Sequence, residues 1–463
     1  MTIFLIIFTL LFIIFAYYRP RLAVLFTIIA LPSYLIRFKV AGLPTTLLEA
    51  MIVINFCVWF FQNAVPNLST WIKNKAKRNA YPFSIEIILI LIISFISVLI
   101  AGFQTNALGL WKAYFIDPIL FFIVICNYFQ TKLELNKIYW SLLISSALVA
   151  LFAIFQKITG LFIDNPFWAN EATRRVVSFF GFPNAVGLFL APLSLLFIGW
   201  LFSNLENKKS WLNYKNVIIT LIIITSWLAI YFAKSEGALI AVITSVFIFL
   251  FLSGYRQKII TGIIFAIFFL ILLFSSPIRS IFIEKITLTD LSGEIRKQQW
   301  VETINMLKNN HPISGAGLSQ YQTAIKPYHQ EGIFYNSDDL PNFDSQVYGS
   351  SALRAKYWQP VEIYFYPHNI ILNFWTELGL AGVLIFVWLI GKYFYLLRGL
   401  IKHFRSSKEK YLYIGLFCSM TAIIIHGLVD VPYFKNDLSV MFWLLLAIVG
   451  ILEINFKLNL EKK

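Results

Sequence analysis

Residues 366–390 read YPHNIILNFWTELGLAGVLIFVWLI, and within this stretch the chain changes from polar to apolar. The only long polar segment, 276–366, precedes it, and the apolar run that begins at Ile371 continues to Leu397. A membrane-spanning helix needs about 20 largely apolar residues. The stretch therefore predicts a chain that enters a membrane here, with His368 at the boundary between water and hydrocarbon.

The composition agrees with a membrane protein. Hydrophobic residues make up 59% and charged residues 13% of the 463 residues, whereas soluble domains average about 45–50% and about 25%. The formal charge of +15 lies mostly in short gaps between apolar runs. Membrane topology requires basic residues there, so this charge does not indicate a nucleic-acid partner.

Apolar runs recur along the whole chain and predict an all-α polytopic membrane protein with about 12–13 transmembrane helices, since the first two runs are short enough to form one hairpin. The runs are 3–17, 22–36, 43–61, 85–101, 110–129, 138–155, 186–202, 217–233, 238–252, 259–274, 371–397, 411–428 and 438–456. We expect three parts: an N-terminal transmembrane bundle (1–275), an outer loop (276–366) and C-terminal transmembrane helices (367–463).

Basic residues predict which side of the membrane each gap faces, because Lys and Arg in short loops stay on the cytoplasmic side. Two apolar runs separate each basic gap from the next, so all can share that side. In chain order the five gaps are 73–78, 132–137, 208–215, 256–258 and 398–410, and the tail with Lys457, Lys462 and Lys463 joins them. The segments 156–182, 234–237 and 276–366 then face outward. The N-terminus is outside if all thirteen runs span the membrane and inside if the first two merge.

The outer loop contains a predicted amphipathic helix over 292–309. Trp300, Ile304 and Leu307 fall on one face, and Met306 falls off it. A second short helix is expected over 318–325. Beyond Pro327 the composition predicts an irregular insert whose aromatic side chains either stack on sugars or mark the membrane interface.

His368 and Glu377 are the first candidates for chemistry, because ionisable groups at the edge of hydrocarbon are costly to keep. A neutral imidazole can act as a base near pH 7; the alternative for His368 is a cap on the following helix. Glu377 could orient a histidine or an arginine. It lies beside Gly379 and Gly382, which could instead serve only close helix packing.

Two cationic positions on the predicted outer side suggest a diphosphate site. A guanidinium group binds phosphate oxygens in a bidentate fashion, which suits Arg296 and Arg175. A solvated helix face and attraction to anionic lipid are the alternatives. His426 and Asp430 have a spacing that would suit a metal pair, but no third ligand is evident, so no metal site is predicted.

Several of these residues form patterns that resemble the O-antigen ligase and polymerase superfamily of bacterial envelope proteins. The resembling patterns are His368-Asn369-Ile370-Ile371-Leu372 with Glu377-Leu378-Gly379-Leu380-Ala381-Gly382, Arg296 and Trp300 with Gly315-Ala316-Gly317, and Arg175 with Phe180-Gly181-Phe182-Pro183-Asn184. The motifs occupy 174–184 and 296–382. One position departs from the family pattern: Glu236 stands where a Ser-Arg-Gly turn would carry arginine, with Lys234 nearby.

The resemblance implies a GT-C-like fold and a metal-independent enzyme without cofactors. Such an enzyme transfers a glycan from an undecaprenyl-diphosphate carrier to the hydroxyl of a lipid or surface-glycan acceptor, on the outer face of the bacterial cytoplasmic (inner) membrane. His368 and Glu377 would be catalytic. Arg296, Arg175 and Lys234 would bind the diphosphate. The supporting residues would be Asn184, Asn369, Trp300, Gly315 and Gly317.

Other functions fit parts of the pattern. A polymerase that joins repeat units, or a protein O-glycosyltransferase, would differ from a ligase in the acceptor alone. A transporter or flippase predicts charged residues near the bilayer centre and interrupted helices in two matching halves. The central runs here mostly lack charges, and the polar residues collect on one side, which favours chemistry at the membrane surface.

Overall fold

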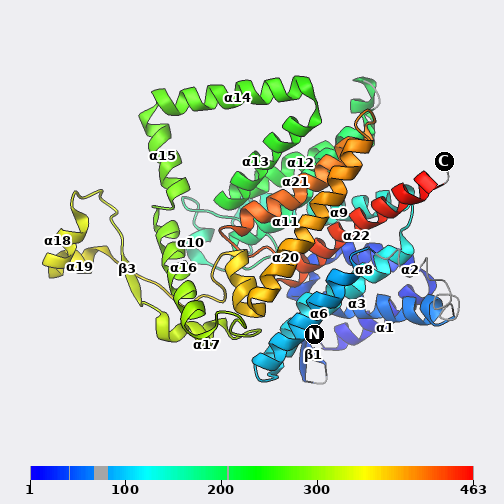
Figure 1. Ribbon diagram of the computed structural model, residues 1–463, viewed down its shortest axis with the longest axis horizontal. Coiled ribbons are helices and arrows are strands. Elements are labelled where there is room, and N and C mark those ends of the chain that lie inside the picture. The colour runs from blue at the N-terminus through cyan, green and yellow to red at the C-terminus, as the bar shows by residue number, and fades with distance from the viewer. Residues whose placement is uncertain (1, 41, 67–81, 206–207, 462–463) are drawn as a thin grey trace.

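The chain folds into a helical bundle, seen in a computed structural model that describes residues 2–40, 42–66, 82–205 and 208–461 (Figure 1). The structure is 77% helical with little sheet. Among the described residues, ten helical segments are long and apolar enough to cross a membrane, and three shorter apolar helices account for the remaining predicted runs. The predicted class, an all-α polytopic membrane protein, is confirmed.

The elements follow the predicted runs closely. The helices are α1 (Thr2–Tyr18), α2 (Pro20–Ile29), α3 (Leu47–Trp59), α6 (Ser84–Ile100), α7 (Thr105–Trp111), α8 (Asp117–Tyr128), α9 (Lys132–Thr159), α10 (Pro166–Ala169), α11 (Pro183–Asn204), α12 (Tyr214–Phe232), α13 (Glu236–Ser253), α14 (Tyr255–Phe274), α15 (Ser276–Thr287), α16 (Leu291–Asn310), α17 (Tyr321–Ile325), α18 (Phe343–Gly349), α19 (Ser351–Tyr357), α20 (Ile370–His403), α21 (Glu409–Gly427) and α22 (Asn436–Glu461). The strands form two antiparallel pairs. β1 (Arg37–Val40) pairs with β2 (Leu43–Thr46), and β3 (Gly332–Phe334) pairs with β4 (Trp358–Pro360).

Burial differs strongly among the spans. In α11 and α22 the most apolar window is 89% buried, whereas in α14 it is 6% buried. α11 packs against α9, α12, α13 and α21, and α14 packs on α13 at the edge of the bundle (Figure 1). The exposed apolar surface of α14 suits lipid tails rather than water.

Predicted basic gaps gather at one end of the bundle. Lys132 pairs with Glu409 at 2.6 Å, which joins the second gap to the fifth. The ring of Tyr411 lies 5.8 Å from that of Phe202, where α11 leads into the third gap. We call this the basic end, and the opposite end, which carries 276–366, the loop end. Two stretches with predicted basic residues lie outside the described residues, 73–78 and 462–463.

Helix α20 is broken at Gly379, whose backbone adopts φ +73° and ψ −177°. The break frees main-chain groups that need partners, and the loop after α16 supplies them. Leu380 N donates to Ile313 O at 2.9 Å, and Ala316 N donates to Thr376 O at 2.7 Å. The loop after α16 is therefore hydrogen-bonded to the first part of α20.

Replacing Gly379 with alanine should destabilise the protein. A positive φ is strained for alanine, and the added Cβ would collide with the carbonyl oxygen of Ile313. Strain of this kind costs about 1–3 kcal/mol, so thermal unfolding in detergent should begin at a lower temperature. Gly391→Ala is the matched control, since Gly391 lies in the same helix with nothing within 4 Å of the added Cβ. Equal unfolding temperatures for the two variants would contradict this account.

The predicted amphipathic helix exists as α16, but its buried face differs from the predicted one. Met306, predicted off the face, is fully buried with Leu307, whereas Trp300 is only partly buried. The polar Glu302 and Thr303 lie on the buried face, where Thr303 bonds the Tyr321 hydroxyl at 3.1 Å. Because these polar residues lie on the buried face, the spacing of apolar residues does not identify that face.

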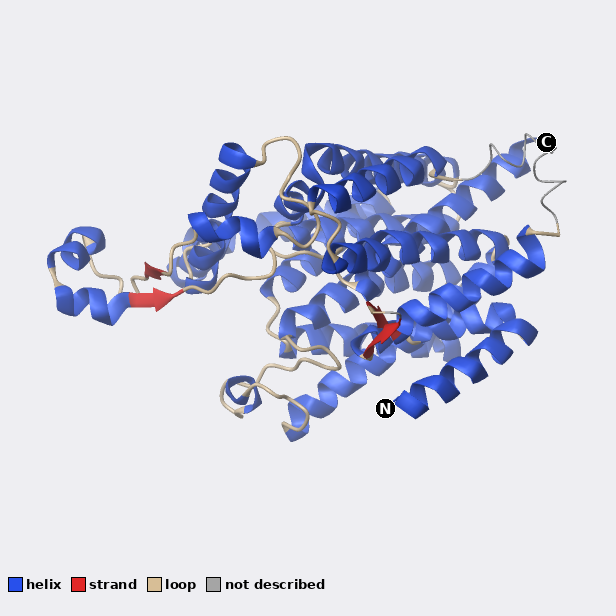
Figure 2. Cartoon of the chain, turned by 90° about the horizontal axis from the view of Figure 1, so that it is seen from below, coloured by secondary structure: helices blue, strands red, loops and turns tan. Residues whose placement is uncertain are grey.

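The insert beyond Pro327, predicted to be irregular, has ordered elements. Strands β3 and β4 close its base, and α18 and α19 project beyond them on the far side from the bundle (Figure 2). Its aromatic rings pack on one another. The ring centroids of Phe334 and Trp358 are 5.2 Å apart, and those of Phe343 and Tyr357 are also 5.2 Å apart. The prediction was wrong because a short polar residue can cap a helix as well as form a loop: the Ser350 side chain caps α19.

Candidate active site

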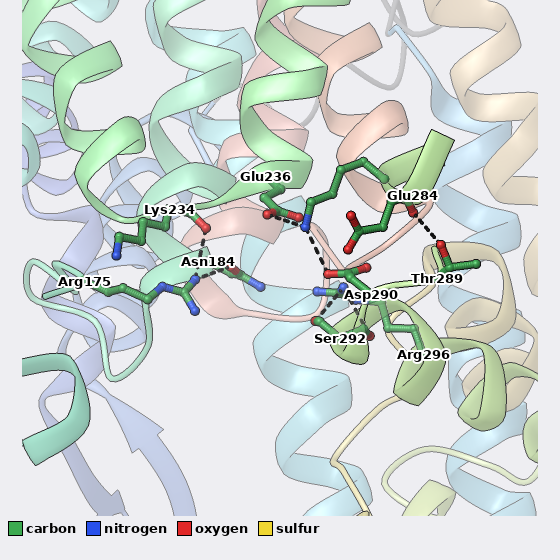
Figure 3. Close-up of polar contacts among 10 residues, drawn as sticks. Arg175, Asn184, Lys234, Glu236, Glu284, Thr289, Asp290, Ser292 and Arg296 are labelled. Atoms are coloured by element: carbon green, nitrogen blue, oxygen red, sulfur yellow. Dashed lines mark hydrogen bonds and ion pairs between the residues drawn. The ribbon is translucent and has the colours of Figure 1, made fainter. Parts of the chain in front are cut away.

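Loops that are distant in sequence meet at the loop end. Arg175, which precedes α11, donates from Nε to Ala233 O at 3.0 Å and from Nη2 to Lys234 O at 3.2 Å (Figure 3). Asn184, in the first turn of α11, donates from Nδ2 to Asp430 Oδ2 at 3.3 Å. The start of α11 thus joins the α12–α13 turn to the turn after α21.

His368 lies at the start of α20 in a left-handed backbone conformation, with φ +45°. Its ring contacts Tyr364 and Tyr366 edge-on, with centroids 5.2 and 4.9 Å away. The cap of α20 is Asn369, whose Oδ1 accepts from the main-chain N–H groups of residues 371 and 372. Because Asn369 caps the helix, the His368 ring does not serve that structural role.

Asp430 lies beside His368, with Oδ1 3.7 Å from Nδ1. Burial alone would raise the pKa of this carboxyl, but His368, His426 and Lys435 outweigh burial and hold its pKa well below the usual range. Val431 N donates to Asp430 Oδ1 at 2.8 Å. Asp430 is therefore an anion in position to fix which nitrogen of His368 faces away from it.

Substituting Asp430 by asparagine should lower stability most at neutral pH. A carboxyl with a lowered pKa stabilises the fold fully above its unfolded pKa of about 3.9, and this contribution is lost as the pH falls below that value. We expect a loss of about 1–3 kcal/mol at pH 7, shrinking towards pH 3. Thermal unfolding in detergent at several pH values measures it. Asp344→Asn, at an exposed site in the insert, is the control; a loss from Asp430→Asn that is equal at pH 7 and pH 3 would sink the idea.

Arg296 on α16 faces the same region as Arg175 (Figure 3). Its Nη1 donates to Ser292 Oγ at 2.9 Å, while its buried Nε has no partner among the described residues. Burial lowers the pKa of Arg175; Glu236 opposes this shift, and the charge of Arg296 adds to it. The two guanidinium groups therefore act on each other electrostatically and leave donors for an anion.

The turn between α12 and α13 supplies a main-chain acceptor for Arg175. Lys234 receives the Arg175 hydrogen bond on its carbonyl oxygen, and its side chain points away from Arg296 (Figure 3). Glu236 Oε1 lies 2.8 Å from Lys285 Nζ. The cation next to Glu236 is thus Lys285 of α15, a residue that sequence reasoning did not consider.

Glu377 anchors the loop after α16. Its Oε2 accepts from Ser319 N at 2.7 Å, and its carbonyl oxygen accepts from the Ser97 hydroxyl. Among the described residues, no hydrogen bond or ion pair joins Glu377 to His368. The place beside His368 that the sequence suggested for Glu377 is taken by Asp430.

The glycines of that loop have a packing role. Gly315 and Gly317 have φ +68° and +96°. A Cβ on Gly315 would meet the Thr376 carbonyl oxygen at 2.6 Å. Trp300, one turn after Arg296, keeps a buried indole N–H without a partner among the described residues. The glycines therefore hold the loop against α20, and Trp300 lies on the helix that presents Arg296.

Lys435, just before α22, is another cation that the sequence analysis did not select. Its ammonium lies 3.8 Å from the centroid of the Phe182 ring, and its buried Nζ has no hydrogen-bond partner among the described residues. Burial lowers its pKa to about 8, against the opposing charges of Asp430 and Asp437. A lone lysine in a short turn carries no sequence signal that would distinguish it from a surface residue.

Comparison with known protein families gives a match to part of the chain. Residues 221–387 match a family model described as O-antigen ligase. The matched range covers Arg296, His368 and Glu377, while Arg175 and Asp430 lie outside it. A search of curated proteins found no match.

Proposed function

We propose that this chain transfers a glycan from an undecaprenyl-diphosphate carrier to an acceptor hydroxyl. The match of residues 221–387 to the O-antigen ligase family model supports the O-antigen ligase and polymerase superfamily. The family is a class of glycan-transferring membrane enzymes that use lipid-linked glycans. The single observation that carries the proposal is the convergence of His368, Arg175 and Arg296 at the loop end.

His368 is the proposed base. Its Nδ1 faces Asp430, which favours a tautomer whose Nε2 can accept a proton from the acceptor hydroxyl. The acceptor oxygen then bonds the anomeric carbon of the donor glycan. The bond from that carbon to the diphosphate oxygen breaks, and its electron pair leaves with the diphosphate. A positioned base of this kind contributes about 10²–10⁴ in rate.

Arg175 and Arg296 are the proposed partners of the leaving diphosphate. Negative charge grows on that group in the transition state, and preorganised donors in a site with little water stabilise it. Asn184 supports Arg175, since its Oδ1 accepts from Nη2 at 3.5 Å and its Nδ2 binds Asp430. Asn184 thereby connects the proposed diphosphate site to the residue beside the base.

The proposed location is the outer face of the bacterial inner membrane. The basic end would face the cytoplasm, because Lys and Arg in short loops are retained there. The loop end would then face outward, with the outer loop 276–366 between the N-terminal bundle 1–275 and the C-terminal helices 367–463. Arg175 comes from the first part, Arg296 from the second and His368 from the third.

Transfer in proteoliposomes tests the proposal. The full-length protein is reconstituted with undecaprenyl-diphosphate-linked glycan and a lipid-linked or glycan acceptor, and mass spectrometry follows the glycosylated acceptor and the released carrier diphosphate. We expect product with and without a metal chelator. A polymer formed from donor alone would identify a polymerase. Transport of the donor across the bilayer without a new glycosidic bond would reject the enzyme proposal.

A further inference from the structure

An ion-paired lysine lies at the edge of the proposed diphosphate site. Lys285 on α15 reaches Glu236 at 2.8 Å and Asp290 at 3.1 Å. Glu236 begins α13, and its charge acts on Arg175. Asp290 precedes α16, six residues before Arg296. The lysine thus connects the start of α13 to the residue before α16, the helix that carries Arg296.

An uncompensated carboxylate at this position would oppose binding of an anionic donor. The Glu236 side chain is 55% exposed, and its carboxylate pairs with the Lys285 ammonium. A diphosphate held by Arg175 and Arg296 would then face both Glu236 and Asp290. Like charges a few ångströms apart repel, and the repulsion is stronger near a protein surface than in bulk water.

We propose that Lys285 is a positioning residue of the donor site, which neutralises Glu236 and so allows a diphosphate to bind between Arg175 and Arg296. The inference rests on the proposed function. It assigns α15 a role in donor binding, although this short helix is not one of the spans. The side-chain hydrogen bonds to Glu236 and Asp290 also raise the pKa of Lys285 against the effect of burial, so the lysine is charged at neutral pH.

The test compares the Michaelis constant for the lipid-linked diphosphate donor among four variants in proteoliposomes. Lys285→Ala leaves two carboxylates facing the donor and should raise this KM about tenfold, with kcat changed much less. Glu236→Gln removes the repelling charge and should leave KM at or below the wild-type value. The double variant Lys285→Ala/Glu236→Gln should return KM to within about threefold of wild type, and Lys285→Arg should behave as wild type.

The same variants separate this role from a structural one. If the ion pair merely fastened α15 to α13, then Glu236→Gln would break the same bond and would impair the enzyme as much as Lys285→Ala. The electrostatic role predicts the opposite, and it also predicts that added salt reduces the KM increase in Lys285→Ala. A wild-type KM in Lys285→Ala, or a double variant as impaired as Lys285→Ala, would overturn the inference.

A matched control and a separate check on the parent proposal complete the design. Lys356 also pairs with a carboxylate, Asp338 at 2.6 Å, but it lies in the projecting insert (Figures 1 and 2). Lys356→Ala should therefore leave the donor KM unchanged. If Arg296→Ala raises KM while Lys285→Ala does not, only the role of Lys285 fails. If neither variant raises the donor KM, the proposal that Arg175 and Arg296 bind the diphosphate is rejected as well.

Discussion

Replacing His368 should lower glycan transfer by about 10²–10⁴ without unfolding the protein, because the acceptor hydroxyl loses its base. The variant to use is His368→Asn. The backbone at this position has φ +45°, a conformation that asparagine tolerates better than alanine or a branched residue. The measurement is kcat for transfer in proteoliposomes, with thermal unfolding of the same preparations.

The control for His368 is another histidine of the outer segment. His311 follows α16 as its C-cap residue and has no role in the proposed mechanism, so His311→Ala should transfer at nearly the wild-type rate. If His368→Asn kept full activity, His368 would not be the base. A stable His368→Asn protein that binds donor normally but transfers slowly would match the assignment.

Removing Arg296 should lower kcat/KM for the donor by about 10²–10³, the usual loss when one preorganised donor to a developing anion is removed. Its Nε has no partner among the described residues, and its Nη1 bonds only locally, to Ser292, so phosphate oxygens can be received without breaking long-range contacts. Arg296→Lys should recover part of the loss, because lysine keeps the charge but lacks the planar fork. Steady-state kinetics against donor concentration measure both variants.

The comparison for Arg296 is Arg354, which lies exposed in α19 of the insert. Arg354→Ala should leave kcat/KM for the donor unchanged. Arg296→Ala with wild-type kcat/KM would show that the diphosphate is held elsewhere. A loss seen equally in Arg354→Ala would point to a general effect of charge on the loop end.

The fold could be predicted from the sequence because the membrane imposes strong rules on it. Helices formed in all the apolar runs. The basic gaps were predicted to lie at the same end of the bundle, and the ion pair between Lys132 and Glu409 joins two of them. The insert could not be predicted, since strands of three residues and helices of seven leave little periodic signal. The prediction of which face of α16 is buried was wrong because the polar residues Glu302 and Thr303 are buried there. The Tyr321 hydroxyl that bonds Thr303 belongs to another helix and is not evident from the pattern of α16.

The candidate site was predictable in its residues but not in their pairing. His368 stood out as an ionisable group at the edge of an apolar run, and Arg175 and Arg296 stood out as possible phosphate ligands. The structure brings all three to one end of the bundle. The sequence suggested Glu377 as a partner of His368 and Asp430 only as a possible metal ligand with His426, because nothing in the spacing says that Gly379 breaks α20 and that Glu377 bonds Ser319. The cation beside Glu236, Lys285, lies 49 residues further along the chain, on another helix, and sequence spacing cannot reveal this pairing.

The paired strands β3 and β4 have a consequence for how this protein could diversify. Gly332 faces Pro360, and Val361 N donates to Glu331 O at 2.9 Å, so the chain leaves and returns at one point. Residues 335–357 form an excursion with its own aromatic packing, and exposed excursions with closed ends accept changes of length and sequence. We therefore expect this segment to tolerate changes of length and sequence, while His368 and the two arginines, which lie outside it, keep their positions.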